Sequence, residues 1–201
     1  MGRTKTYDRD EVTDRAMRVF WERGYHAAST RDLADAMGIN SYSLYAEFGS
    51  KEQLYGDAMQ RYHELIVTRH FGGLEAADAS LEEVEAVLDY FGGGPEVTAS
   101  TLGCLACNAA VELAPTAETS RLSTDRYLER VSNAFRNALQ NARVEGRLTD
   151  GAPIDELAEF LTVTVTGMLV LIRSGSDPAY LRAGRTQALE RLRQFASSTK
   201  V

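Results

Sequence analysis

The side chains best suited to chemistry fall in residues 29–54, which read STRDLADAMGINSYSLYAEFGSKEQL. Two short helical patterns meet there across Gly38, which can take the left-handed conformation that a tight turn requires. On the second pattern Leu44 and Phe48 lie four residues apart and are expected to point into a small core. The opposite face then carries small hydroxyls and aromatic rings, which suit close contact with a DNA major groove.

The charge of the sequence excludes a broad basic DNA-binding patch. The formal net charge is −7, and residues 1–55 hold 8 basic and 9 acidic side chains. No Arg or Lys lies between Ser41 and Glu47, so bidentate readout of guanine from this stretch is not expected. Specificity would rest on thymine methyl contacts, hydroxyl or water bridges and DNA shape. Any DNA binding must come from a few placed groups and from dimeric avidity, with Arg3 and Lys5 as a flexible arm.

A second candidate for chemistry is a pair of cysteines, Cys104 and Cys107, three residues apart on one helical face. They could form a thiol switch or half of a metal site, or they could be two small residues in a packed helix. The three histidines are scattered at 26, 63 and 70, so we expect no metal site and no cofactor. Two cysteines cannot staple a chain of this length, which favours a reduced, cytoplasmic protein.

Polar side chains on otherwise apolar helices indicate where a small-molecule effector could bind, because a buried polar group needs a partner. The candidates of this kind are Tyr62, His63, Tyr90, Asn108, Glu112, Thr162 and Thr166. No Ser–His–Asp arrangement, phosphate loop or paired-carboxylate motif stands out. The sequence therefore gives no support to an enzyme.

The elements that must position these residues are all helical. Apolar periodicity and Gly or Pro breaks predict helices at 7–23, 30–37, 40–47, 50–70, 80–91, 100–113, 116–145, 154–173 and 178–197. Residues 161–165, LTVTV, alternate like a strand, but they have no partner strand and continue into a longer apolar run. The most apolar run, residues 157–172, is short and interrupted by Glu159, so a buried helix explains it better than a membrane span. The expected division is a helix-turn-helix domain at 1–55 and a larger helical domain at 56–201.

The N-terminal pattern resembles that of TetR-type repressors. The matching positions are Ala16, Phe20, Gly24-Tyr25, Thr30, Leu33-Ala34, Gly38-Ile39, Leu44-Tyr45, Phe48 and Ser50 to Leu54. Gly103-Cys104-Leu105, Asn108 and Val111-Glu112-Leu113 are similar to a segment of one branch of that family. The resemblance implies a homodimer whose C-terminal helices form a ligand pocket and a four-helix interface, with ligand binding releasing DNA.

The resemblance also implies residue roles on the DNA side. Thr30 and Arg31 would contact phosphates, and Tyr45 and Lys51 would hold further phosphates. The reading edge would consist of Asn40, Ser41, Tyr42 and Ser43.

These roles predict a ligand-responsive repressor that binds a palindromic double-stranded operator as a homodimer, through helices 154–173 and 178–197. The alternative is a helical module that senses a ligand or thiol oxidation without binding DNA, which the near-neutral N-terminal part favours.

Overall fold

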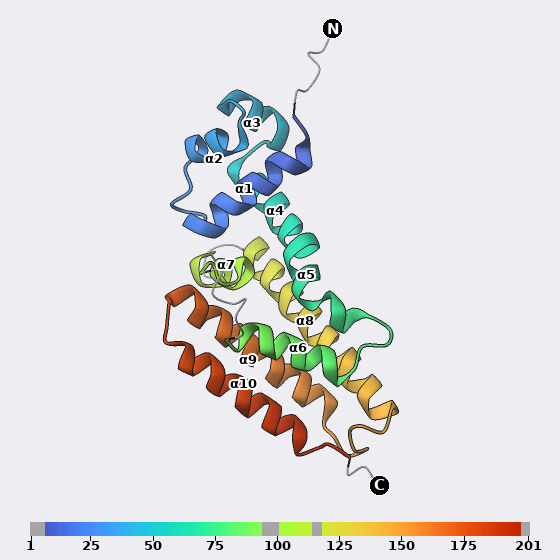
Figure 1. The fold of residues 1–201 in the computed structure, drawn as a ribbon. Helices are drawn as coiled ribbons and strands as arrows, with labels where there is room; N and C mark the ends of the chain where they lie inside the picture. Colours follow the sequence, from blue (N-terminus) through green and yellow to red (C-terminus); the bar gives the residue numbers. More distant parts are fainter. Residues whose placement is uncertain (1–6, 94–100, 114–117, 198–201) are drawn as a thin grey trace.

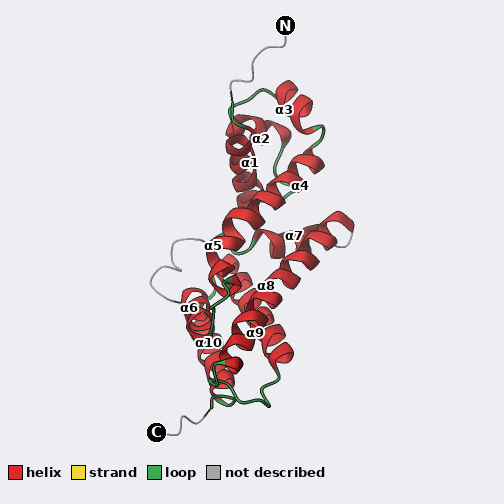
Figure 2. Ribbon diagram, turned by 90° about the vertical axis from the view of Figure 1, so that its right-hand side faces the viewer, coloured by secondary structure: helices red, strands yellow, loops and turns green. Residues whose placement is uncertain are grey.

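The computed structural model describes residues 7–93, 101–113 and 118–197, so the predicted arm residues Arg3 and Lys5 lie outside the described part. Its elements are helices, which confirms the all-α prediction (Figure 2). Within the described ranges the only β pairing is one isolated antiparallel bridge, Leu148 to Ala196. Residues 161–165 lie inside a long helix and form no strand.

The N-terminal unit, here called the head (residues 7–55), contains α1 Arg9–Arg23, α2 Thr30–Met37, α3 Ser41–Phe48 and the start of α4 Lys51–Tyr62. Asp8 caps α1 by accepting hydrogen bonds from the backbone N–H groups of Asp10 and Glu11, so the helix begins two residues after its predicted start. Apolar side chains of all four helices meet in one core, with Phe20, Leu33, Leu44 and Leu54 fully buried.

The predicted single helix at 50–70 is wrong in its middle. After α4 the chain makes a π-helical segment, η1 His63–Val67, then α5 Thr68–Phe71 and a 3₁₀ turn, η2 Gly72–Glu75. The cause lies outside the segment: Arg130 Nη1 donates to the His63 carbonyl at 2.8 Å, and Thr68 Oγ1 donates to it at 3.3 Å. A π turn leaves room for such side-chain donors, and it bends the path that leaves the head.

The remaining helices form the body (residues 56–197): α6 Leu81–Phe91, α7 Leu105–Leu113, α8 Glu118–Val144, α9 Ile154–Ser174 and α10 Pro178–Arg193. The predicted helices at 100–113 and 178–197 are therefore too long at their start and end respectively. α9 packs between α8 and α10, and α7 lies across the end of the body that faces the head (Figure 1). The predicted domain boundary at residue 55 falls inside α4, so head and body share this helix.

α9 is also long and apolar enough to cross a membrane, by length and composition alone. Only 39% of its most apolar window is buried within the chain. Much of its apolar surface therefore faces outward from the chain.

Candidate nucleic-acid interface

The helix-turn-helix is built by capping groups that the local sequence supplies. Ser29 caps α2, and its side chain and that of Asp32 form a reciprocal capping box. Gly38 ends α2 in the left-handed conformation, with φ at 69°, which is a backbone state that costs a side-chain-bearing residue about 1 kcal/mol or more. Asn40 then caps α3 by accepting a hydrogen bond from the Ser43 N–H at 2.8 Å.

This turn leaves α3 with one buried and one exposed face. Leu44 and Phe48 are buried in the head core, as predicted, while Tyr42 is 84% exposed and Tyr45 is 49% exposed. The Tyr45 hydroxyl lies 3.2 Å from the Thr30 Oγ1, so a hydrogen bond joins α3 to the start of α2. A phosphate placed there could contact both hydroxyls at once.

The single acidic side chain of α3, Glu47, is turned away from that exposed face. Arg9 Nε lies 3.3 Å from one Glu47 oxygen, and the Tyr7 hydroxyl donates to the other at 3.4 Å. The Arg9 guanidinium also stacks 5.0 Å above the Phe48 ring. The charge of Arg9 therefore offsets that of Glu47, which would otherwise repel DNA, and the Tyr7 hydroxyl helps to hold the carboxylate in place. Sequence reasoning missed this function, because Arg9 lies 38 positions before Glu47 in the chain.

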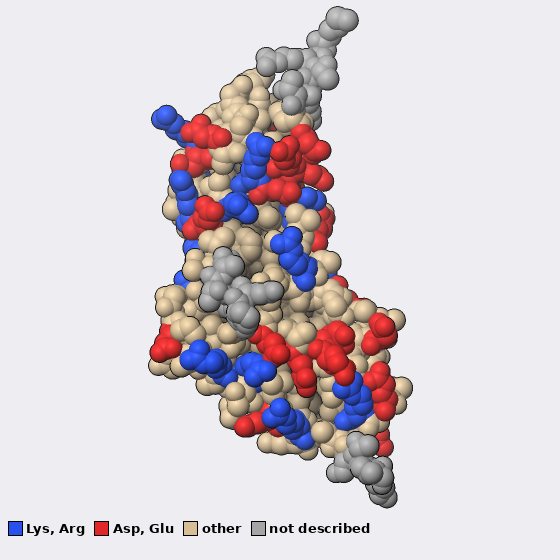
Figure 3. Space-filling model, viewed as in Figure 1, with Lys and Arg blue, Asp and Glu red and all other residues tan. Residues whose placement is uncertain are grey.

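Lys51, at the first turn of α4, is partly buried in a second cluster. Its ammonium lies 4.4 Å above the Tyr25 ring. Burial lowers the pKa of Lys51, and the negative charge of Glu112 opposes that shift. By contrast Arg31 is almost fully exposed, with a single long ion pair of 3.8 Å to Asp35 one helical turn away. Figure 3 shows acidic and basic side chains interspersed over the visible side of the head.

The side chains of Glu112, Trp21 and Arg173 connect the head to the part of the body beyond α4. The Glu112 carboxylate of α7 accepts the backbone N–H groups of Tyr25 and His26, at 2.9 and 2.6 Å. The Trp21 indole donates to the carbonyls of residues 102 and 103, at 3.1 and 3.2 Å. Arg173 of α9 donates to the Glu22 carbonyl at 3.0 Å. Movement of α7 or α9 would therefore displace the turn between α1 and α2 directly.

An aromatic cavity of about 50 Å³ lies just behind these contacts. It brings together two of the predicted ligand residues, Tyr62 and Tyr90, and its wall also contains Trp21, His70 and Tyr127. Burial lowers the pKa of His70, and the nearby charge of Arg69 lowers it further. Sequence reasoning missed the last three residues because their ring types and spacing are those of any helical core.

The other predicted ligand residues have different surroundings. The Asn108 amide donates to the Leu102 carbonyl at 3.1 Å, and Thr162 Oγ1 donates to the Ala158 carbonyl within its own helix at 2.8 Å. His63 belongs to the π segment, and Glu112 holds the head, as described above. Thr166 Oγ1 is buried with no hydrogen-bond partner in the described part of the chain. These five residues are not among those that line the cavity.

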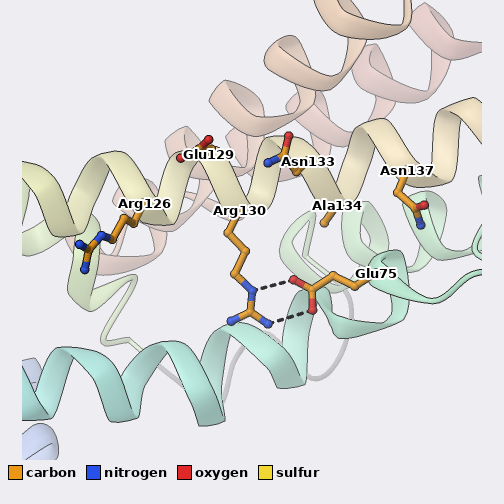
Figure 4. Close-up of a pocket in the computed structure, with 7 residues that line it drawn as sticks. All are labelled: Glu75, Arg126, Glu129, Arg130, Asn133, Ala134 and Asn137. Atoms are coloured by element: carbon orange, nitrogen blue, oxygen red, sulfur yellow. Dashed lines mark hydrogen bonds and ion pairs between the residues drawn. The ribbon is translucent and has the colours of Figure 1, made fainter.

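A larger, open hollow of about 480 Å³ lies over α8, but an ion pair fills its centre (Figure 4). Arg130 Nε and Nη2 donate to the two oxygens of Glu75, at 2.6 and 2.9 Å. The same guanidinium holds the His63 carbonyl and donates to the Thr68 hydroxyl at 2.9 Å. All of these Arg130 contacts hold the π segment and Glu75 in place. We therefore assign the hollow a structural role.

Two family models match the chain. One, described as bacterial regulatory proteins of the tetR family, matches residues 12–58, which contain the helix-turn-helix. The other, described as a tetracyclin repressor-like C-terminal domain, matches residues 80–189. The chain belongs to the TetR family.

Full-length relatives agree with this assignment and confirm the resemblance inferred from the sequence. The HTH-type transcriptional repressor ComR of Escherichia coli (strain K12) is 31% identical over 204 residues, covering 98% of this chain and 90% of ComR. The repressor DhaR of Mycobacterium sp. (strain GP1) is 28% identical over 173 residues, or 86% of this chain and 85% of DhaR. Among solved structures, a cysteine mutant of the TetR family regulator CifR, in complex with 26-bp operator DNA, superposes with a TM-score of 0.81 at 31% identity. That match covers 94% of this chain and 98% of CifR.

Proposed function

We propose that this TetR-family protein is a ligand-responsive repressor that binds a palindromic operator as a homodimer in the cytoplasm. The observation that carries the proposal is the exposed face of α3, where Tyr42 projects from a helix that is otherwise anchored in the head core. Residues 1–55 would form the DNA-binding part and residues 56–201 the effector-binding and dimerisation part. The repressor names of ComR and DhaR and the operator complex of CifR support the same function.

On the DNA, Tyr42, Ser41 and Ser43 would face the base edges, while Asn40 holds the start of α3. Thr30 and Tyr45 would contact one phosphate through their paired hydroxyls, and Arg31 and Lys51 would supply charge. The stretch from Ser41 to Glu47 lacks Arg and Lys, so readout would depend on apolar contacts, water and groove shape.

A second copy of the chain is the occupant we propose for the outer face of α9. Phe160, Val163 and Val170 are exposed there, with Val163 at 71%, and no heavy atom outside the helix backbone and its neighbouring residues lies within 4 Å of where a Gly167 Cβ would stand. These residues recur at helical spacing, so they form one apolar stripe on the outer face of α9. Pairing of two such stripes, flanked by α10, would bury it and explain the apolar character of α9.

The effector would enter the aromatic cavity. At about 50 Å³ the cavity is far smaller than the roughly 300–1,000 Å³ of typical ligand sites, so binding must separate its walls. Trp21 of α1 and Tyr62 of α4 form part of those walls and pack edge to face, with ring centroids 5.1 Å apart. Opening the cavity would therefore shift the head relative to the body and change the spacing of the two recognition helices.

The near-neutral charge of residues 1–55 favours a second candidate function, a sensor that does not bind DNA. Fluorescence anisotropy with labelled duplexes from the DNA upstream of the gene separates the two. We expect a saturable complex with one duplex at low salt. The variant Tyr45→Ala with Lys51→Ala should weaken it by about tenfold or more, and should make its salt dependence shallower because phosphate contacts are lost.

The matched control is Arg69→Ala, which removes an exposed cation from α5 without touching the head. It should bind as the unmodified protein does. Absence of any specific complex, or equal weakening by Arg69→Ala, would favour the sensor without DNA binding.

A further inference from the structure

The two cysteines occupy a specific place in the fold, the N-terminus of α7. Cys104-Leu105-Ala106-Cys107 is a C-x-x-C sequence whose first cysteine stands in the N-cap position, directly before the helix. Its sulfur accepts the backbone N–H of Cys107 at 3.4 Å, as a capping serine oxygen would. Both thiols are free and buried, with Cys104 only 1% exposed.

The pair lies within disulfide reach after a small movement. Side chains three residues apart on a helix have Cβ atoms about 5–6 Å apart, whereas a disulfide needs roughly 3.5–4.5 Å. A helical backbone would resist that approach, but Cys104 lies outside the helix. Its cap can rearrange while Leu105 and the residues that follow stay helical.

Polar neighbours make one of the thiols the reactive one. Burial raises the pKa of the Cys104 thiol, but hydrogen bonds from Cys107 and Tyr62 outweigh it and hold that pKa below its usual value. The same hydrogen bond to Cys104, together with burial, raises the pKa of the Cys107 thiol. Of the two thiols Cys104 is therefore the one that ionises more readily, and the helix N-terminus stabilises its thiolate.

Tyr62 connects this pair to the DNA-binding part. Burial raises the pKa of the Tyr62 hydroxyl, and the neighbouring Cys104 thiol raises it further, although Tyr62 belongs to α4, which begins in the head. Its ring also contacts Trp21 of α1. A change at the Cys104 sulfur would therefore alter the contacts of α4 and, through Trp21, those of α1, which support the helix-turn-helix.

A route to the thiols is provided by the aromatic cavity. Gly103, Tyr62 and Tyr127 line it, and they are the neighbours of Cys104 in the chain and in space. The Tyr127 hydroxyl is buried in this wall, next to the Cys104 thiol whose pKa it helps to lower. A hydroperoxide that enters the cavity carries oxygens that could accept a hydrogen bond from this hydroxyl, beside the thiol.

We propose that Cys104 and Cys107 are a hydroperoxide-reactive dithiol, and that their oxidation to an intramolecular disulfide breaks the contact between Cys104 and Tyr62 and so weakens DNA binding. The Cys104 thiolate attacks the outer oxygen of the hydroperoxide; the O–O bond breaks, the alcohol leaves with a proton, and Cys104 becomes a sulfenic acid. Cys107 then attacks that sulfur, and water leaves. One hydroperoxide oxidises two thiols and is reduced to an alcohol and water.

The effect on DNA rests on the proposed function, so the test measures the chemistry separately. The reduced protein is treated with equimolar hydrogen peroxide or tert-butyl hydroperoxide, and its intact mass and free thiols are measured. We expect the loss of two hydrogens and of both thiols without cross-linked dimers, reversed by dithiothreitol. Persistent free thiols, a sulfinic acid or a disulfide between chains would overturn the proposal.

Single variants separate the two steps. Cys107→Ser should stop at the sulfenic acid, which dimedone traps as one adduct, and Cys104→Ser should not react with equimolar peroxide. Tyr62→Phe should still form the disulfide, but the pH midpoint of its oxidation rate should rise because the thiolate loses a hydrogen bond. Thermal melts check that each variant is folded. The test of disulfide formation in the unmodified protein does not depend on the variants.

Operator binding completes the test. Oxidation should weaken the complex of the unmodified protein by about tenfold, within the range of ordinary allosteric coupling, and should leave the affinity of Tyr62→Phe unchanged. If the reduced protein binds no DNA, the proposed function fails while the dithiol chemistry can still hold. If the disulfide forms and affinity does not change, the coupling through Tyr62 is wrong.

Discussion

At the scale of single residues, the junction between α1 and α2 depends on how closely Gly24 approaches α7. Gly24 has φ at 83°, and a Cβ there would lie 2.6 Å from Oε2 of Glu112. That oxygen is the acceptor for the Tyr25 N–H, so a side chain at position 24 must displace the carboxylate from the turn it holds. The glycine therefore serves both the turn and the contact between head and body.

We expect Gly24→Ala to destabilise the protein more than Gly146→Ala, measured as the free energy of unfolding in urea. Both glycines have positive φ, but no heavy atom lies within 4 Å of a Cβ at Gly146. Strain alone should cost about 1–2 kcal/mol at each site, and loss of the Glu112 hydrogen bonds should add about 1–3 kcal/mol at Gly24. Glu112→Ala should then cost less in the Gly24→Ala background than alone; independent effects would contradict this account.

His70 is expected to make the stability of the folded protein depend on pH. Its ring lies 4.7 Å from Tyr90 and 5.5 Å from Phe91 in the cavity wall. Burial and then Arg69 hold its pKa below the ordinary 6.5. Below that value the unfolded chain takes up a proton that the folded chain resists, so the stabilisation present at neutral pH is lost as pH falls through the folded pKa.

The melting temperature should therefore fall between about pH 7.5 and 5.5, and His70→Phe should reduce that fall. Burial, followed by the charges of Arg130 and Arg126, lowers the pKa of His63 too, so some dependence should remain. The control is His26→Gln, which replaces an exposed histidine of the head and should keep the full fall. An identical fall in the His70→Phe protein would rule out this assignment.

At the scale of elements, the starts of the head helices follow from short-range signals that the sequence displays. Ser29, Asn40 and Ser50 each accept a backbone N–H three residues ahead, so the cap and its helix are neighbours in the chain. The exposed face of α3 could be predicted for the same reason, since Leu44 and Phe48 define its buried side.

Elements that depend on distant partners could not be predicted in this way. The π segment forms around a donor 67 residues away, Arg130, and the sequence near His63 reads as ordinary helix. The same holds for the cavity, whose walls come from α1, α4, α5, α6, α8 and α9. Glu112 was expected to face a ligand because it is polar on an apolar helix, but nothing local indicates that the α1–α2 turn supplies its two donors.

The contacts of Arg130 lead to a prediction for the π segment that connects head and body. Arg130→Met removes a two-bond ion pair to Glu75 and leaves the His63 carbonyl with Thr68 as its side-chain donor. We expect a loss of about 1–3 kcal/mol, because a partly buried carbonyl and carboxylate lose charged donors. Faster amide hydrogen exchange in residues 63–68 should accompany it.

The matched control for that variant is Arg136→Met, one and a half turns along α8. Arg136 pairs with Asp155, whose side chain is largely exposed, and such surface pairs contribute about 0–1 kcal/mol. If both variants lose the same stability, or if exchange at 63–68 is unchanged in Arg130→Met, then Arg130 does not hold the π segment.

At the scale of the whole molecule, weak charge in each head makes DNA affinity depend on having two of them. A head with net charge near zero gains little from long-range attraction, so one copy should bind poorly. Two heads held at a fixed spacing raise the effective concentration of the second at its half-site. On the proposed function, assembly through α9 would therefore be a condition of operator binding.

The variant Val163→Glu with Val170→Glu tests this dependence, because it places two charges on the exposed apolar stripe of α9. We expect a monomer by light scattering, a melting profile that shows a folded chain, and operator affinity reduced by about a hundredfold or more, since avidity gives gains of about 10²–10⁴. The control Val144→Glu puts a charge on a still more exposed valine at the end of α8 and should stay dimeric. A double variant that remains a dimer would move the interface away from this stripe. A monomer that kept full affinity would instead mean that a single α3, with its tyrosines and hydroxyls, suffices to hold the operator.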